Sequence, residues 1–311
     1  MMSAFSVQRH GESLGSLRLL ITGASGLLGS KLVKLAIESG HEVHSLYFEH
    51  SMQEGRPQQL DVTDQAAVEK ALTDKLPEVV IHAASITDLD LCEQNPQLAF
   101  RVNATATGYI AEACRSVKSM LIYLSTDYIF DGERGNYREN DKPNPVNVYG
   151  KSKLLGEEEV ARKAGDFCIA RTSVVFGWGR RHRPNFATWV HENLRAGQRI
   201  NVVTDQYATP TLNSNLARML VEAAERRLNG IFHLSGSTRV NRYEFAVLMA
   251  RKFGFDEKLL TSVKAESTSW IARRPFDSSL NVAKAQASLN NRPSTLDEAL
   301  NEFADEAHAR T

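Results

Sequence analysis

Short apolar runs alternate with amphipathic stretches through the first half of the chain. The runs are rich in Val, Ile and Leu and are apolar on both faces, which is typical of strands covered by helices on both sides. We expect strands at residues 17–22, 42–48, 79–84, 120–124, 167–172 and 230–234. Helical patterns lie between them at residues 27–39, 65–75, 96–116 and 149–164. This alternation predicts an α/β fold with a doubly wound parallel sheet of the Rossmann type.

The pattern changes after Phe176. Residues 177–184 form a loop of glycine, arginine and proline, helical patterns follow at 186–196, 213–227 and 243–253, and strand signal is weak after residue 241. We expect a NAD(P)-binding domain at 17–176, completed by the strand near 230–235. A smaller, discontinuous substrate-binding domain would comprise 177–229 and 236–311 and cover the carboxyl edge of the sheet. Residues 1–16 lack the apolar core of a signal peptide and are expected to be a flexible extension.

Composition excludes several classes of function. The 37 basic residues balance the 37 acidic residues, so no general basic field predicts binding to nucleic acid or anionic membranes. No apolar run approaches the ~17 residues of a membrane span. The cysteines Cys92, Cys114 and Cys168 are widely spaced, without a CxxC motif, which indicates reduced thiols, no metal site and a cytoplasmic protein.

A glycine-rich segment joins the first predicted strand to the first predicted helix. Gly23, Gly26 and Gly29 form a GxxGxxG pattern with Ser25, Leu27 and Leu28 between them. The first glycine permits a tight turn, the second lets the backbone approach a pyrophosphate, and the third allows close helix–sheet packing. Amides at the helix N-terminus then face the anion. In this context between a strand and a helix the loop predicts a dinucleotide site; the alternative is that the three glycines serve only turns and packing.

The end of the second strand bears on the choice between NADP and NAD. An acid that grips the adenosine ribose is usual there, but Tyr47 occupies the place, and Glu49, two residues later, is equally compatible with a solvent-facing position. Without a carboxylate to repel a 2′-phosphate, NADP is favoured and NAD is the alternative. Arg56 could contact that phosphate or simply be a surface arginine.

Three polar residues predict acid–base chemistry. Tyr149 and Lys153 lie one turn apart on a predicted helix, so both project from one face. A neighbouring ammonium would lower the pKa of the phenol and make it a usable acid–base group. Thr126 follows the strand at 120–124, at the edge where ligands bind in open α/β sheets. The alternatives are a solvated helix face for the pair and a turn cap for Thr126.

These segments resemble the extended short-chain dehydrogenase/reductase superfamily over nearly all of residues 17–300, and within it the dTDP-4-dehydrorhamnose reductase family. The resemblance is carried by residues 23–29, 82–85, 125–132, 149–153, 156–157, 171–173, 205–206, 210–211 and 274–275. It implies that Thr126, Tyr149 and Lys153 are catalytic, with Asn103 as structural support. It further implies that Asp61 and Val62 lie by the adenine, Ser85, Ile86 and Thr87 by the middle of the cofactor, and Leu124 near the nicotinamide.

The resemblance also separates reaction classes. Sugar 4,6-dehydratases of this superfamily carry Thr-Asp-Glu, whereas Tyr128 follows Thr126 and Asp127 here, and epimerases usually carry Ser-Ser. Val174 replaces a tryptophan typical of the rhamnose enzymes. NADPH-dependent reduction of a nucleotide-linked 4-keto-6-deoxy sugar is therefore predicted, and the chain is compatible with a homodimer. The alternative is an NADP-binding regulatory subunit like the β subunit of methionine adenosyltransferase.

Overall fold

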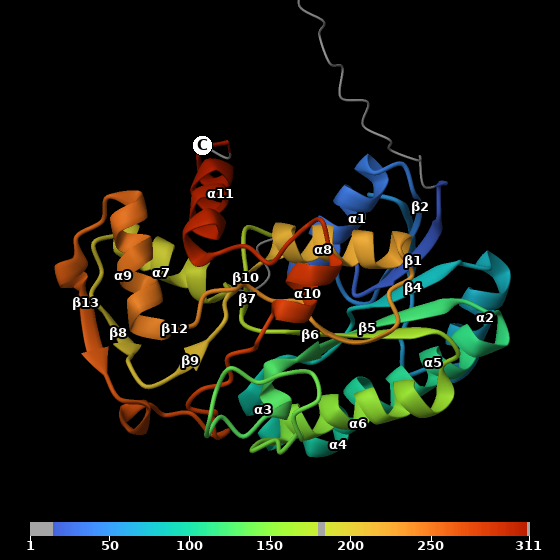
Figure 1. Cartoon of the computed structure of the whole chain (residues 1–311), viewed down its shortest axis with the longest axis horizontal. Coiled ribbons are helices and arrows are strands. Elements are labelled where there is room, and N and C mark those ends of the chain that lie inside the picture. The colour runs from blue at the N-terminus through green and yellow to red at the C-terminus, as the bar shows by residue number, and fades with distance from the viewer. Residues whose placement is uncertain (1–14, 180–183, 310–311) are drawn as a thin grey trace, which may run out of the picture.

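The computed structural model describes residues 15–179 and 184–309 and is built on a seven-stranded parallel sheet (Figure 1). Residues 1–14 of the expected N-terminal extension lie outside the described ranges. The strand order is β11-β6-β5-β4-β1-β2-β3, and every neighbouring pair is parallel. The strands are β1 (Arg18–Thr22), β2 (Glu42–Tyr47), β3 (Arg56–Gln59), β4 (Val79–His82), β5 (Met120–Thr126), β6 (Phe167–Thr172) and β11 (Gly230–His233).

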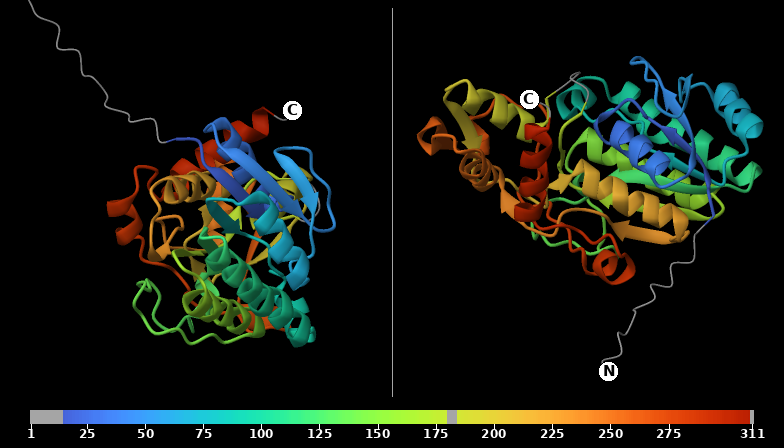
Figure 2. Two further views of the ribbon diagram at one scale, coloured as in Figure 1. Left: turned by 90° about the vertical axis from the view of Figure 1, so that its right-hand side faces the viewer. Right: turned by 90° about the horizontal axis from the view of Figure 1, so that it is seen from above.

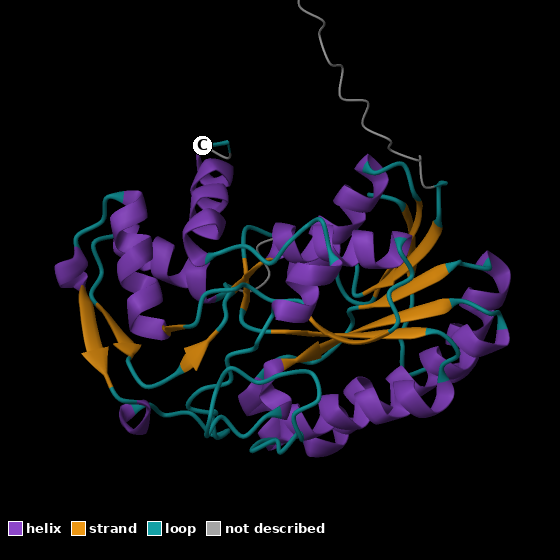
Figure 3. Ribbon diagram, in the orientation of Figure 1, coloured by secondary structure: helices purple, strands orange, loops and turns teal. Residues whose placement is uncertain are grey.

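Helices cover both faces of this sheet, as Figure 3 shows. One face carries α1 (Leu27–Glu38), α8 (Asn213–Glu225) and α10 (Ala283–Ser288). The other carries α2 (Gln65–Lys75), α3 (Leu89–Gln94), α4 (Pro96–Phe100), the π turn η1 (Arg101–Thr105), α5 (Ala106–Ser116) and α6 (Val148–Lys163). Side chains alternate between the two cores along each strand: Leu19 and Ile21 face α1 and α8, whereas Leu20 faces α2 and α5. The two-sided apolar pattern of the strands follows from this layering.

A smaller lobe lies beside the sheet, as Figure 1 and the right-hand view of Figure 2 show, and it faces the carboxyl ends of the strands across a cleft. Its helices are α7 (Phe186–Arg195), α9 (Arg242–Phe253) and α11 (Leu296–His308), and the short 3₁₀ turns η3 (Glu257–Leu259) and η4 (Ala265–Ser267) flank its strand β13 (Leu260–Val263). A third short turn, η2 (Asp127–Ile129), follows β5 of the sheet. The strand pairs of the smaller lobe are β8 (Ile200–Val203) with β13, β9 (Tyr207–Ala208) with β12 (Val240–Asn241), and β7 (Val175–Phe176) with β10 (Thr211–Leu212). Aromatic side chains fill its core, with Phe176 edge-on to Phe245 and Phe303.

The predicted doubly wound parallel sheet is confirmed, and the structure adds elements that the pattern missed. Strand β3 has the sequence RPQQ and lies at the sheet edge, where polar residues and proline are tolerated, so it carries no apolar signal. Helices α3 and α11 and strand β13 were also not predicted. Helix α8 falls within residues expected in the smaller domain, but it packs on α1 in the core of the sheet, because its apolar face matches that of α1. Within the described residues, no helix has both the length and the apolarity that crossing a bilayer needs.

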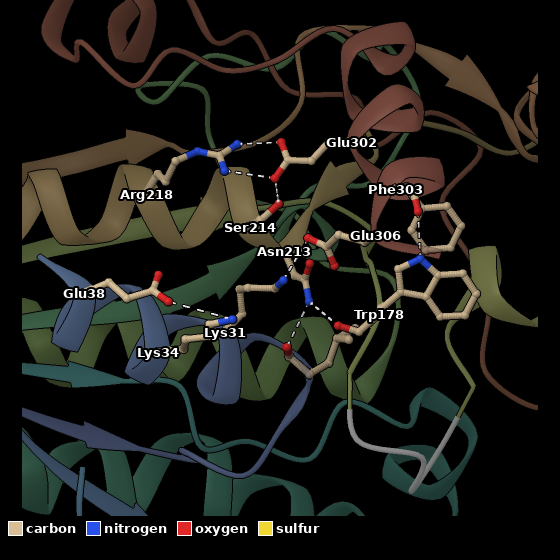
Figure 4. Close-up of polar contacts among 11 residues, drawn as sticks. Lys31, Lys34, Glu38, Trp178, Asn213, Ser214, Arg218, Glu302, Phe303 and Glu306 are labelled. Carbon is tan, nitrogen blue, oxygen red and sulfur yellow. Dashed lines mark hydrogen bonds and ion pairs between the residues drawn. The ribbon is translucent and has the colours of Figure 1, made fainter. Parts of the chain in front are cut away.

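Helix α11 joins the smaller lobe to the sheet through polar contacts on α1 and α8 (Figure 4). Glu302 accepts hydrogen bonds from Ser214 and from both terminal nitrogens of Arg218, and Lys31 on α1 pairs with Glu306 at 2.8 Å. On an adjoining face of α11, the Trp178 ring stacks on Phe303 with centroids 4.6 Å apart, and its indole nitrogen donates to the Phe303 carbonyl at 2.8 Å. One helix therefore connects both cores.

A substitution at Phe303 tests the packing of α11 in the core of the smaller lobe. Phe303 is fully buried, so Phe303→Ala removes a large side chain where the surroundings collapse only in part, and we expect the free energy of unfolding to fall by about 3–5 kcal/mol. Asp305→Ala, at an exposed position on the same helix, is the control and should stay within about 0.5 kcal/mol. Chemical denaturation measures both, and equal effects of the two substitutions would contradict the packing described.

Candidate active site

A cleft of about 2010 Å³ separates the carboxyl edge of the sheet from the smaller lobe. Single-ligand pockets commonly measure ~300–1,000 Å³, so this cleft has room for two ligands side by side. Its lining comes from the phosphate loop, from the ends of β2, β4, β5 and β6, and from α6, α7 and α9. The wall therefore consists of the strand ends at which open α/β sheets bind ligands.

The glycine-rich loop forms one end of the cleft. Of the predicted loop residues, Gly23, Ser25, Gly26, Leu27, Leu28 and Gly29 all line it. Gly23 has φ +65°, and a Cβ there would lie 2.7 Å from the Ala84 nitrogen; a Cβ on Gly29 would lie 2.1 Å from the Gly23 carbonyl oxygen. Gly26 differs, because its Cβ would meet only that same oxygen, at 3.2 Å. Gly23 and Gly29 are thus needed for packing, whereas space is kept open at Gly26, the N-cap of α1.

Backbone after β4 forms the next part of the wall. Ser85, Ile86 and Thr87 line the cleft, as predicted for the middle of the cofactor. Asn103 in the π turn is fully buried and holds this segment from both sides: its Oδ1 accepts from the Ile86 nitrogen at 2.8 Å, and its Nδ2 donates to the Ile86 carbonyl at 3.0 Å. Asn103 also donates to Ser152 on α6 at 3.0 Å, so it joins the cleft wall to that helix.

Thr126, Tyr149 and Lys153 all line the cleft. Thr126 ends β5, and the other two project from the first turns of α6, which begins with Asn147 as its N-cap. Lys153 is only 2% exposed, and its Nζ donates to the Leu124 carbonyl at 2.6 Å. Leu124, which was predicted near the nicotinamide, lines the cleft as well. Helix α6 is thus fastened to the end of β5, where the hydroxyl, the phenol and the ammonium face one space.

The expectation that Lys153 lowers the pKa of Tyr149 below its ordinary value is wrong. Burial raises the pKa of the Tyr149 phenol well above its ordinary value, and the nearby Thr126 hydroxyl lowers that pKa in part. Burial likewise lowers the pKa of Lys153 to about 7, and the Glu157 carboxylate raises it. Burial outweighs the pairing because both groups lose their hydration when α6 packs on β5. The phenol is therefore protonated at neutral pH.

A buried carboxylate lies beside Thr126. Asp127 is 2% exposed and accepts from Thr126 at 3.0 Å, from Ser173 at 2.7 Å and from Ser278 at 2.5 Å. Burial raises its pKa, and the three hydroxyl donors lower it. The single hydroxyl proton of Thr126 serves Asp127 in the structure, and it can turn to an acceptor in the cleft only by leaving that bond.

The strand ends expected near the adenine divide into two groups. Glu49 and His50 line the cleft, whereas Tyr47, Asp61 and Val62 are not among its lining residues. The Asp61 carboxylate accepts from the backbone and hydroxyl of Thr63, both at 2.8 Å. Arg56 pairs with Glu42 on the neighbouring strand. The alternative for Glu49 was a position that simply faces solvent. In the structure its exposed side chain lies on the cleft.

The wall opposite the sheet contains residues that the sequence analysis did not predict as site residues. Trp178, Phe186 and Arg242 line it, and the Arg242 guanidinium lies 4.8 Å from the centre of the Phe186 ring. Val174 also lines the cleft and has φ +40°, a conformation rare for a β-branched residue and typical of functional sites. Only the breaker-rich loop around Trp178 could have signalled this wall, since these residues meet the sheet through tertiary packing.

Comparisons with known proteins agree with this geometry. The sequence matches the family model of the RmlD substrate binding domain over residues 17–309. It is 33% identical to a dTDP-4-dehydrorhamnose reductase of Aggregatibacter actinomycetemcomitans, over 91% of this chain and 97% of that protein. It is 32% identical to methionine adenosyltransferase 2 subunit beta of Xenopus tropicalis, over 86% of this chain and 81% of that protein. A dTDP-4-dehydrorhamnose reductase of Bacillus anthracis in complex with NADP has TM-score 0.82 and 28% identity, covering 94% of this chain and all of that one.

A substitution at Gly26 tests whether the glycine-rich loop binds a pyrophosphate. Gly26→Val places a side chain where a pyrophosphate would approach the α1 amides, so we expect NADPH affinity to fall by about 100-fold or more, ~2.7 kcal/mol. The fold should persist, because only one atom lies within contact of the new Cβ. Gly165→Val, where a Cβ meets nothing within 4 Å, is the control. Fluorescence titration and circular dichroism measure the two effects, and unchanged affinity would show that the loop is misassigned.

Proposed function

The chain belongs to the RmlD substrate binding domain family, and from this membership we propose that it is an NADPH-dependent reductase of a nucleotide-linked 4-keto-6-deoxy sugar. One observation carries the proposal: Thr126, Tyr149 and Lys153 converge in the cleft that the glycine-rich loop also lines. The relatives named dTDP-4-dehydrorhamnose reductase support the reaction class. The size of the cleft supports a cofactor and a second ligand bound together.

The residues present fit a dinucleotide. The first turn of α1 offers its amides at Gly26, where a Cβ would have open space on the cleft side, and the structure related to this chain at 28% identity holds NADP. The loop would hold the pyrophosphate, Ser85–Thr87 the middle of the molecule, and Lys153 the nicotinamide ribose. When bound, NADPH supplies a hydride to the carbonyl carbon of the sugar.

The chain itself handles the charge and the proton. As the carbonyl carbon is reduced, negative charge develops on its oxygen, and Tyr149 donates its phenolic proton there. The phenol carries its proton at neutral pH, so that proton is available for transfer, although burial, which raises its pKa, opposes formation of the phenolate. Thr126 turns its hydroxyl from Asp127 to the same oxygen and stabilises the developing charge. Lys153 in its ammonium form stabilises the phenolate that remains.

A second candidate is supported by the relatives named methionine adenosyltransferase 2 subunit beta. In this case the chain would bind NADP and a partner enzyme without turnover. Retention of Thr126, Tyr149 and Lys153 in one cleft favours the reductase. A wild-type chain that is inert toward dTDP-, GDP- and UDP-linked 4-keto sugars, yet captures an adenosyltransferase tightly, would overturn the reductase.

Tyr149→Phe tests the proton donor. The substitution removes one oxygen, so we expect turnover to fall by about 10²–10⁴-fold while stability and NADPH affinity stay near wild type. Thr126→Ala should lower turnover chiefly, and Lys153→Met should lower both turnover and NADPH affinity. NADPH oxidation with a panel of nucleotide 4-keto sugars is the assay.

Two controls match these variants. Lys151→Met changes an exposed lysine on the same helix, and Tyr109→Phe removes a phenol outside the cleft lining; both should retain wild-type turnover. Wild-type turnover in Tyr149→Phe would exclude the phenol as the proton donor.

The residues at the end of β2 allow a test of the preference between NADPH and NADH. Because Tyr47 stands where an acid is usual, we expect NADPH to bind more tightly than NADH, by no more than about tenfold or ~1.4 kcal/mol. Glu49 lines the cleft, so Glu49→Gln should raise the preference for NADPH by removing a charge that repels a 2′-phosphate. Glu69→Gln, an exposed position on α2, is the control. A wild-type preference for NADH that Glu49→Gln abolishes would identify Glu49 as the residue that grips the ribose.

A further inference from the structure

Lys153 places an ammonium group in the protein interior, where a charge loses its hydration. Its side chain is almost fully buried, and its direct contacts are the Leu124 carbonyl at 2.6 Å and the face of the Tyr123 ring at 4.2 Å. Both contacts are favourable for an ammonium group, but neither carries a negative charge. A buried ammonium without a compensating anion tends to release its proton. The structure must therefore supply a counter-charge if Lys153 is to stay cationic.

Glu157 lies one turn further along α6, on the face that Lys153 occupies. Its carboxylate is 4% exposed and is bonded on both oxygens: Ser125 donates to Oε1 at 2.5 Å, and Arg171 donates through Nε to Oε1 at 3.0 Å and through Nη2 to Oε2 at 2.7 Å. Arg171, from β6, is itself 2% exposed. The Glu157 carboxylate thus bonds the buried Arg171 directly, and its charge acts on the buried Lys153 one turn away. Ser125 links that carboxylate to the strand end that carries Leu124 and Thr126.

We propose that Glu157 is a positioning residue for the reaction, whose carboxylate offsets the buried Arg171 guanidinium and keeps the Lys153 ammonium charged. Without that carboxylate, Lys153 and Arg171 would be two buried cations with no anion between them. A guanidinium does not give up its proton in proteins, so Lys153 would lose its own. The functional consequence rests on the proposed function, in which the charged Lys153 stabilises the Tyr149 phenolate.

The other titratable groups around Lys153 do not replace this charge. His82, from β4, is neutral because burial lowers its pKa to about 3; Tyr123, from β5, and Tyr149, from α6, are neutral because burial raises their pKa values. Among the described residues, the carboxylate that raises the pKa of Lys153 is that of Glu157. The ammonium is present below its pKa and is lost as the pH rises through it. Loss of Glu157 therefore moves that transition to lower pH.

The direct test is an NMR titration of the Lys153 side chain in the full-length protein. Lysine is labelled with ¹³C at Cε, and the Lys153 signal is identified by its absence from Lys153→Met. In Glu157→Gln we expect the titration midpoint to fall by about one pH unit or more. Glu158→Gln, the same change at the neighbouring exposed position, should leave it unchanged. An unchanged midpoint in Glu157→Gln would overturn the proposal.

Two further variants separate charge from packing. Arg171→Met leaves Glu157 with Lys153 as its buried cation, so the midpoint should rise, opposite to the effect of Glu157→Gln. Glu157→Asp keeps the charge and should restore the midpoint toward wild type. Thermal unfolding of each variant is followed in parallel, and if Glu157→Gln does not fold, the sign of the Arg171→Met shift decides. A shift in the same direction for both substitutions would indicate packing alone.

The pH dependence of kcat/KM gives a further measurement, which would not change if Glu157 had only a structural role. Activity that needs the Lys153 ammonium falls at alkaline pH, and in Glu157→Gln this fall begins at lower pH, so the ratio of variant to wild-type kcat/KM declines from pH 6 to pH 8. A purely structural defect would lower the ratio equally at both values and would contradict the proposal. A wild-type protein with no turnover would refute the proposed function, whereas the NMR midpoints would still decide the role of Glu157.

Discussion

The bond from the buried Lys153 ammonium to the Leu124 carbonyl ties α6 to the end of β5, and the arrangement of the site follows from it. Tyr149 lies one turn before Lys153 on α6, and Thr126 lies two residues beyond Leu124 on β5. A strand and a helix that are adjacent in space therefore present the hydroxyl and the phenol to one point. The Asn103 amide, which holds Ile86 and Ser152, fixes the neighbouring wall against the same helix.

The second wall depends on contacts between distant parts of the chain. Trp178 stacks on Phe303, while Asn213 on α8 donates to the carbonyls of Trp178 and Leu27, at 3.1 and 3.2 Å (Figure 4). Leu27 is the first residue of α1 after the phosphate loop. The position of the smaller lobe is thus connected to the loop proposed to hold the pyrophosphate, through one asparagine and one stacked pair of rings.

Burial is the common cause of the electrostatics at the site. It raises the pKa of Tyr149 and Asp127 and lowers that of Lys153, in each case opposing the charged form. The chain counters this with hydrogen-bond donors around Asp127 and with the Glu157 carboxylate one turn from Lys153 on α6. The protonation of side chains in the cleft therefore depends on neighbouring residues that do not themselves face the proposed substrate.

Local pattern was sufficient for six of the seven strands of the sheet, and it predicted the glycine-rich turn before α1 and the common face of Tyr149 and Lys153, because periodicity, glycine spacing and the helical turn act within a few residues. It did not identify β3, a strand of three polar residues and one proline at the sheet edge, or the place of α8, which packs on α1 in the core of the sheet. It also predicted the wrong direction for the pKa of Tyr149, since burial cannot be read from two residues one turn apart. The Glu157–Arg171 pair and the wall at Trp178 and Arg242 join segments far apart in the chain, so they exist only once packing has brought those segments together.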